Sequence, residues 1–162
     1  MPVDIRPATL RDVTYIAANM REQDWREISC LTNETRLGIG ALSYLAAPEF
    51  TYVAWYRGDP VTAFGISPSA IATCWIGWAY GRSLLPRTIP AITRFFRSTL
   101  RQRALDVGIR RVEVRSIIDH DVSHRWLTGM GATREAELPD YGMTGETFVL
   151  YSWTRKTTNV SV

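Results

Sequence analysis

The sequence predicts one domain of mixed α/β (α+β) class, in which a mostly antiparallel central sheet carries helices on both faces. Its 162 residues suit a single domain, and its composition (46% hydrophobic, 22% charged) is that of an ordinary globular protein. In some segments apolar and polar residues alternate, as they do in strands, and between them lie segments whose apolar residues have helical spacing. Their order is strand, helices, three strands, helix, strand, helix and two strands. A meander followed by a strand–helix–strand unit predicts the mixed sheet.

The N-terminal third reads as one strand followed by three helices. Residues 3–7 alternate and form the strand, after which Thr9 is placed to cap a helix, with Asp12 three residues later. The first helix runs to about Met20, and two further helices cover residues 21–31 and 33–46.

Three strands follow at residues 50–56, 61–66 and 72–80, each rich in aromatic and β-branched side chains. The tetrapeptide Arg-Gly-Asp-Pro at residues 57–60 contains an adhesion tripeptide. Its position between two strands favours a simple turn instead.

A long amphipathic helix is predicted after Pro86 and Pro90, with apolar residues spaced from Ile92 to Ala104 and Gly108 as its end. The chain then returns as a strand over residues 111–118. A short helix, capped by Asp121 or Ser123, ends at Gly131. The remaining predicted elements are a strand pair at 132–138 and 148–153, a domain boundary after residue 154, and a polar tail over 155–162.

The sequence carries no membrane or secretion signal. The N-terminus lacks the apolar core of a signal peptide, and the most apolar stretch, residues 67–81, is shorter than the roughly 20 residues that a bilayer requires. Cys30 and Cys74 lack ligand spacing and are expected to be buried, reduced side chains. These features predict a cytoplasmic protein without a membrane span.

Positive charge is concentrated in one segment. Net charge is only +3, yet residues 82–115 contain nine arginines and two acids. Basic segments favour the phosphates of a cofactor or of nucleic acid, and a solvated helix face gives the same pattern. No aromatic residues interleave with the arginines on the exposed face of the helix, so nucleic-acid binding is the least favoured interpretation.

The order of elements, with Gly108 and Gly131 closing two helices, resembles the GNAT (acetyltransferase-like) superfamily. The opening Ile5-Arg6-Pro7-Ala8-Thr9 and the segment 120–132 are similar to the corresponding family segments. This resemblance implies a GNAT-like sheet and acetyl-CoA as cofactor.

A narrower resemblance, over about residues 3–153, is to the GNAT-like internal virion protein A group of short-tailed phages. It rests on the following phrases: Asn19-Met20-Arg21 with Asp24 and Glu27, Pro60-Val61-Thr62-Ala63-Phe64-Gly65, Trp75-Ile76, His124-Arg125-Trp126-Leu127 with Met130-Gly131-Ala132, and Gly145 with Phe148. It implies a bacteriophage origin, a phage or host protein partner, and a location in the host cytoplasm or the virion.

The family grips the cofactor's pyrophosphate with a glycine-rich loop at the start of the long helix. Counting back from Gly108 places this loop at residues 87–92, where Arg87 fits but Pro90 and Ile92 replace the glycines. Arginines offer an alternative set of phosphate donors. The candidate cofactor-binding residues are Trp78, Tyr80, Arg82, Arg87 and Thr88.

The family's usual general acid is a tyrosine four residues before the glycine that corresponds to Gly131, and this chain has Leu127 there. Glu113 shares a strand face with two arginines, so an ion pair is expected rather than a catalytic base. His120 and His124 are the remaining catalytic candidates because histidine titrates near neutrality. Their spacing alone does not predict a metal site, since no third ligand accompanies them.

Acidic side chains on the second predicted helix offer an acceptor site. Glu22, Asp24 and Glu27, with Trp25, could receive a cationic amine, and an exposed amphipathic helix would show the same pattern.

The sequence therefore favours a phage-type GNAT-fold protein with a degenerate acyl-CoA site, weakly or not catalytic. The alternative is an active acyl-CoA-dependent N-acetyltransferase.

Overall fold

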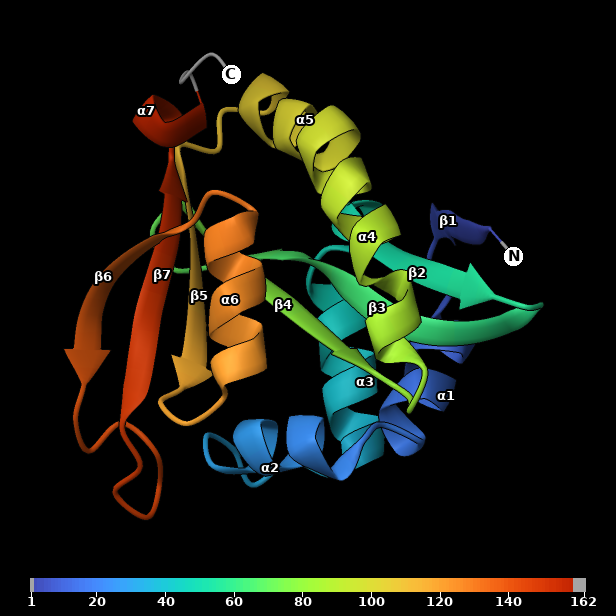
Figure 1. Cartoon of the computed structure of the whole chain (residues 1–162), viewed down its shortest axis with the longest axis horizontal. Helices are drawn as coiled ribbons and strands as arrows, with labels where there is room; N and C mark the ends of the chain where they lie inside the picture. Colours follow the sequence, from blue (N-terminus) through green and yellow to red (C-terminus); the bar gives the residue numbers. More distant parts are fainter. Residues whose placement is uncertain (1, 159–162) are drawn as a thin grey trace.

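Seven strands form a single sheet in the order β1-β2-β3-β4-β5-β7-β6 in the computed structural model, which describes residues 2–158 (Figure 1). All neighbouring strands are antiparallel except β4 and β5. The strands are β1 (Val3–Pro7), β2 (Thr51–Tyr56), β3 (Asp59–Pro68), β4 (Cys74–Gly81), β5 (Arg111–Ile117), β6 (Thr133–Leu138) and β7 (Phe148–Thr154). The predicted mixed, mostly antiparallel fold is confirmed.

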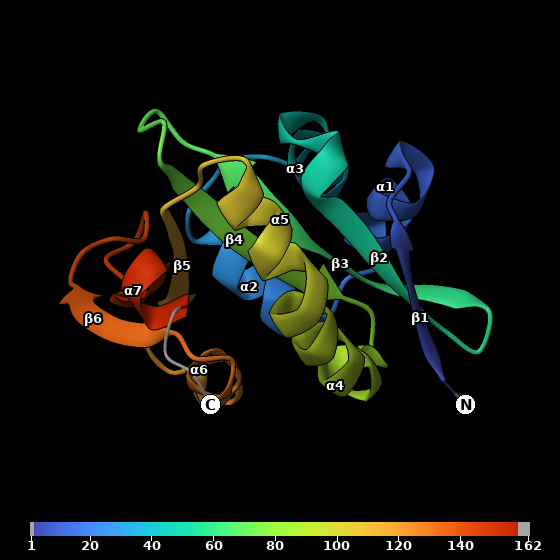
Figure 2. The same ribbon diagram turned by 90° about the horizontal axis from the view of Figure 1, so that it is seen from above.

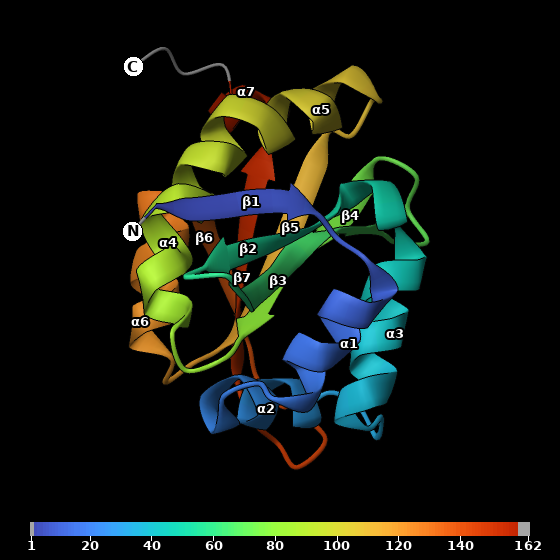
Figure 3. The same ribbon diagram turned by 90° about the vertical axis from the view of Figure 1, so that its right-hand side faces the viewer.

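Helices cover both faces of this sheet (Figures 2 and 3). The first face carries α1 (Leu10–Ala18), α2 (Glu22–Ser29) and α3 (Arg36–Ala46). The second face carries one long helix, composed of α4 (Leu85–Phe95), the π-helical turn η2 (Phe96–Leu100) and α5 (Arg101–Asp106), and beside it α6 (Asp121–Gly129). The short elements are η1 (Pro48–Phe50) and α7 (Arg155–Thr158).

Each face has its own apolar core. On the α4 side, Tyr52 of β2 stacks on Phe64 of β3, and the Phe95 ring meets the Tyr52 ring at a centroid distance of 4.7 Å. On the other side, Val13 and Ile16 of α1 pack against Val53 with no exposed surface. Because strand side chains alternate between faces, the consecutive residues of β2 and β3 supply both cores.

Strands β4 and β5 separate in the middle of the sheet. They pair only over Cys74–Ile76 and Arg111–Glu113, although β4 continues to Gly81 and β5 to Ile117. The two strands diverge beyond this short register (Figure 1). The sheet is therefore open at its centre, which positions the site described below.

The local end signals act as predicted at three helices. The Thr9 hydroxyl accepts the Asp12 N–H at 3.2 Å, and Gly108 and Gly131 adopt φ values of +87° and +89° at the predicted ends. Helix α6 differs, because His120 rather than Asp121 or Ser123 occupies the N-cap position, without a side-chain capping bond.

The prediction that the long helix begins near Ile92 is wrong. Helix α4 begins at Leu85, with Pro86 in its first turn and Pro90 inside it. Proline is tolerated in the first turn because no N–H is needed there. Pro90 is exposed, and it leaves only the carbonyl of Pro86 without its usual helical donor.

The predicted polar tail is helical where the structure describes it: Arg155–Thr158 form α7, and the rest of that prediction, residues 159–162, lies outside the described residues. Within residues 2–158, no helix is both long and apolar enough to cross a membrane.

Candidate functional site

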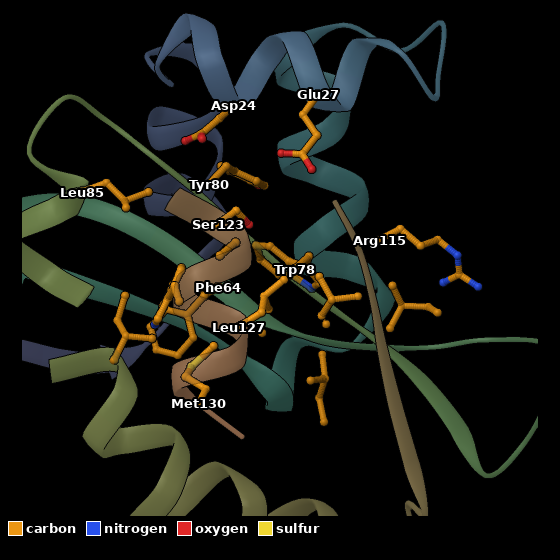
Figure 4. A pocket seen from close by; sticks show the side chains of 18 of the residues that line it. Asp24, Glu27, Phe64, Trp78, Tyr80, Leu85, Arg115, Ser123, Leu127 and Met130 are labelled. Atoms are coloured by element: carbon orange, nitrogen blue, oxygen red, sulfur yellow. The ribbon is translucent and has the colours of Figure 1, made fainter. Parts of the chain in front are cut away.

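A cavity of about 350 Å³ fills the gap between β4 and β5 (Figure 4). Its walls come from both faces of the sheet, with α2 and α3 on one side and α4 and α6 on the other. Apolar side chains form most of the wall: Phe64, Ile76, Trp78, Val114, Leu127 and Met130. Such a concave, largely apolar space with a few polar groups is the usual form of a small-molecule site.

Two carboxylates project from α2 toward this cavity, Asp24 and Glu27 (Figure 4). Asp24 is only 6% exposed. Its Oδ1 accepts from Arg21 Nη2 at 2.7 Å, and its Oδ2 accepts from the Gly81 N–H at 2.9 Å. The Arg21 N–H donates in turn to the Gly81 carbonyl. Asp24 therefore fixes the start of α2 to the end of β4, a positional role that leaves it fully hydrogen-bonded.

Glu27 contacts the histidine that the sequence offered as a catalytic candidate. Its Oε2 lies 2.9 Å from His120 Nδ1, and its Oε1 accepts the Ile117 N–H at 2.7 Å. His120 Nε2 faces the side-chain nitrogen of Gln23. His120 therefore bridges α2 at two points, with Nδ1 toward Glu27 and Nε2 toward Gln23. This carboxylate–histidine pair can accept a proton at the cavity wall.

His124 does not share this position. It contacts the carbonyl of Ile117 through Nε2 at 3.0 Å, and its ring packs against Tyr151. The two histidines thus lie in different surroundings, and His124 does not line the cavity. Across residues 2–158, no three His, Cys, Asp or Glu side chains gather closely enough to hold a metal ion.

Trp78 and Tyr80, two of the predicted cofactor-binding residues, line the cavity as a stacked pair with ring centroids 5.3 Å apart. Trp78 donates from Nε1 to Ser67 Oγ. The Tyr80 hydroxyl is buried and makes no hydrogen bond to a described residue. Burial raises the pKa of Tyr80 to about 12. The Ser43 hydroxyl, which itself donates to the Ile39 carbonyl, acts to lower the pKa of Tyr80 but has the smaller effect. The buried hydroxyl thus remains a neutral donor over the physiological range.

The other three predicted cofactor-binding residues, Arg82, Arg87 and Thr88, do not line the cavity. Arg82 donates to the Pro60 carbonyl and lies over the Tyr15 ring. Thr88 is fully buried and shares a 2.8 Å hydrogen bond with Thr62 of β3. Arg87 is exposed on the first turns of α4. Of the five predicted residues, Trp78 and Tyr80 lie at the cavity and the other three lie outside its lining.

The position predicted for the phosphate-gripping loop is wrong, because residues 87–92 lie inside α4 and Ile92 is buried in the core. The true connection from β4 to α4 is only residues 82–84. At this helix start, the Leu85 N–H donates to the Arg82 carbonyl and the Arg87 N–H to the Leu84 carbonyl. Pro86 between them has no N–H. These residues of the first turn offer no N–H group to an anion.

The α6 wall lacks an acid. Leu127, which replaces the tyrosine that the family resemblance implies, is 5% exposed and lines the cavity beside Ser123 and Met130 (Figure 4). No side chain at this point in the wall can donate a proton at working pH except through the Ser123 hydroxyl, which is a poor acid.

Glu113 forms the expected ion pairs. Its carboxylate accepts from Arg111 Nε at 2.6 Å and from Arg115 Nη2 at 2.7 Å. Partial burial acts to raise the pKa of Glu113, but hydrogen bonds and charge from the two arginines hold it below its usual value. Arg111 also holds the pKa of Glu135 low. Glu113 is thus a structural carboxylate rather than a base.

The depressed pKa of Glu113 predicts a specific acid response. A carboxyl group whose pKa is lower in the folded state stabilises the fold above its unfolded pKa, and this stabilisation is lost as pH falls through the folded pKa. We expect Glu113→Gln to cost about 1–2 kcal/mol at pH 7 and to flatten the fall in stability below about pH 5. Urea unfolding between pH 3 and 7 measures both effects. Glu49→Gln, at an exposed position, should keep the wild-type profile; an equally steep profile in Glu113→Gln would contradict the prediction.

Sequence reasoning missed the contact between Glu27 and His120. The two residues are 93 positions apart, and no local pattern marks their meeting. Cys74 is buried as expected, whereas Cys30 is half-buried, and both are free thiols whose pKa is raised chiefly by burial.

Comparison with solved structures identifies the architecture as the GNAT acetyltransferase fold. Ard1 from Thermoplasma volcanium matches with a TM-score of 0.69 at 17% identity, over 95% of this chain and 98% of that one. The yncA protein of Salmonella typhimurium, solved with its cofactor acetyl-CoA, matches with a TM-score of 0.70 at 16% identity, over 94% and 93%. Ribosomal-protein-alanine N-acetyltransferase from Brucella melitensis matches with a TM-score of 0.70 at 16% identity, over 93% and 99%.

The likeness is one of fold. No protein-family model matches the sequence, and no curated protein matches it.

Proposed function

We propose that this protein is a phage-type GNAT-fold protein with a degenerate acyl-CoA site, which transfers acyl groups from free coenzyme A weakly or not at all. It acts instead through a phage or host protein partner, in the virion or during its assembly. A neighbour of the same fold is solved with acetyl-CoA, so the same cofactor is the reference ligand for this site.

The start of α4 carries the proposal. Binding of a diphosphate at a helix start needs free backbone N–H groups, aligned with the positive end of the helix dipole. Here the N–H groups of Leu85 and Arg87 donate to the carbonyls of Arg82 and Leu84, and Pro86 has no N–H. The connection of three residues from Gly81 leaves no glycine-rich loop that could wrap a phosphate.

Exposed apolar side chains support a protein partner. Leu37, Leu42 and Leu45 of α3 are 59%, 55% and 63% exposed. Their spacing places them along the outer side of one helix, and contiguous exposed apolar surface is typical of interaction sites. The sequence phrases shared with internal virion proteins support the setting of that partner.

Isothermal titration with acetyl-CoA tests the proposal. We expect a Kd weaker than about 1 mM for the wild type, and no further loss in Arg87→Ala. Arg11→Ala, on the opposite face of the sheet, is the matched control. A Kd in the low micromolar range that weakens at least tenfold in Arg87→Ala, but not in Arg11→Ala, would overturn the proposal.

One observation favours the second candidate, an active N-acetyltransferase. The Glu27–His120 pair lines the cavity and could deprotonate an attacking amine, which direct transfer from a bound thioester requires. Release of free thiol from acetyl-CoA in the presence of amines, above the uncatalysed rate, would favour this candidate over the first.

A further inference from the structure

The cavity reaches the surface between the first turns of α4 and α6. Pro86 and Val122 both line it and are both exposed, with Ile89 and Ser123 just inside. Leu84, the residue before α4, is 44% exposed. A slender, largely apolar chain is the kind of ligand that such an opening admits.

Farther along, the two helices are joined. Trp126 Nε1 donates to Thr93 Oγ1 at 3.0 Å, and Arg97 Nη2 donates to the Gly129 carbonyl at 2.5 Å. These two bonds bridge α6 to α4 and η2 above the opening. Both bonds lie beyond the first turns of the two helices, where Pro86 and Val122 are exposed.

A basic stripe of four arginines runs along the long helix from this opening, and comprises Arg87, Arg94, Arg97 and Arg101. Their spacing of seven, three and four residues keeps them on one side of a helix. None of the four forms an ion pair with a residue in the described part of the chain. The helix contains one acid, Asp106, which accepts from Gln102.

The length of the stripe identifies the kind of partner. The fourteen helical steps from Arg87 to Arg101 span about 20 Å at 1.5 Å per residue. A single phosphate or diphosphate would need converging donors, whereas an extended row of arginines that have no acidic partner among the described residues complements an extended acidic surface. Nucleic acid fits less well, because the exposed positions between the arginines are Pro90 and Ser98, and neither can stack on a base.

We infer that this site takes the thioester arm of an acidic acyl carrier protein. The carrier docks on the basic stripe, and its phosphopantetheine arm enters the cavity between the first turns of α4 and α6. Such a donor has no adenosine diphosphate group, so it does not need the N–H grip that the start of α4 lacks. The inference rests on the proposed function in that one respect, the weak hold on free coenzyme A.

Binding measurements on the intact protein test the inference. The probes are a bacterial acyl carrier protein loaded with an acetyl group on its arm, the same carrier without the arm, acetyl-CoA, and a single-stranded DNA oligonucleotide. We expect the loaded carrier to bind at least about tenfold more tightly than each of the other three, and its affinity to fall as salt rises.

Two variants test separately how the basic stripe and the opening contribute to binding. Arg94→Glu combined with Arg101→Glu should weaken binding of the loaded carrier at least about tenfold, while the double change Arg11→Glu with Arg57→Glu, at exposed positions away from the stripe, should not. Val122→Trp, at an exposed position, should abolish the difference between the loaded carrier and the carrier without its arm. Circular dichroism and urea unfolding confirm that each variant is folded.

Each contrary result has a definite meaning. Equal binding of the two carriers to the wild type, tighter binding of DNA, or no binding of the loaded carrier would each overturn the inference. None of these results touches the proposed function, whereas tight binding of acetyl-CoA would overturn both.

Discussion

Gly65→Ala is expected to cost at least about 3 kcal/mol of folding free energy, a large part of the stability of a typical domain. Gly65 of β3 pairs with Thr51 at the point where η1 turns into β2. A Cβ atom at Gly65 would lie 2.3 Å from the Phe50 carbonyl oxygen and 3.2 Å from the Thr51 Cα. These are backbone atoms of a paired strand, so no side-chain rotation relieves the overlap. Strands β2 and β3 must separate or shift instead.

Urea unfolding of Gly65→Ala measures this cost. Gly129→Ala is the matched control, because nothing lies within 4 Å of a Cβ at that position in α6. Alanine is better than glycine by up to about 1 kcal/mol in a helix, so this control should be neutral or slightly stabilising. Wild-type stability in Gly65→Ala would show that the close approach of β3 to Phe50 is not rigid.

Asp24→Ala should destabilise the protein by about 3–5 kcal/mol, because it leaves a partly buried guanidinium and a buried N–H without their acceptor. Asp24 and Arg21 are 6% and 21% exposed at their side chains. The Gly81 N–H, which Asp24 accepts at 2.9 Å, belongs to the last residue of β4, beside the cavity. Loss of Asp24 should therefore free the start of α2 as well as lower global stability.

Two measurements separate these effects. Urea unfolding gives the global loss, and amide hydrogen exchange at Gly81 should accelerate more than exchange at Val53, which lies inside β2 and has no contact with Asp24. Asp119→Ala removes an exposed ion pair with Arg26, whose side chains are 57% and 60% exposed, and should leave both readings unchanged. Unaltered Gly81 exchange in Asp24→Ala would contradict the anchoring role.

Two features of the site favour different functions: the cavity suits a bound ligand, whereas the start of α4 does not suit a diphosphate. The cavity between β4 and β5 keeps an apolar wall and a carboxylate–histidine pair. At the start of α4, the N–H groups of Leu85 and Arg87 donate to local carbonyls, and Pro86 has no N–H. Under the proposed function, a site that holds a diphosphate weakly can still use its cavity for a ligand held elsewhere, and the proposed docking on the basic stripe would provide that hold.

Local signals in the sequence predicted most of the fold. The alternation of apolar and polar residues predicted the strands, and Thr9 and two glycines marked helix ends. The position of Arg111, Glu113 and Arg115 on one strand face predicted the ion pairs that form. Each of these depends on residues within a few positions of one another. The start of α4 was misplaced because two prolines read locally as a break, while burial of Leu85 and Thr88 draws the helix onto the sheet.

The sequence by itself determined the order of elements and most helix ends, because backbone propensity and side-chain periodicity act over a few residues. Only the tertiary structure decided that Glu27 meets His120, that Asp24 holds Gly81, and that β4 leaves β5 after three pairs. These contacts join segments tens of residues apart. They are fixed by how the two faces of the sheet pack, which no local pattern encodes.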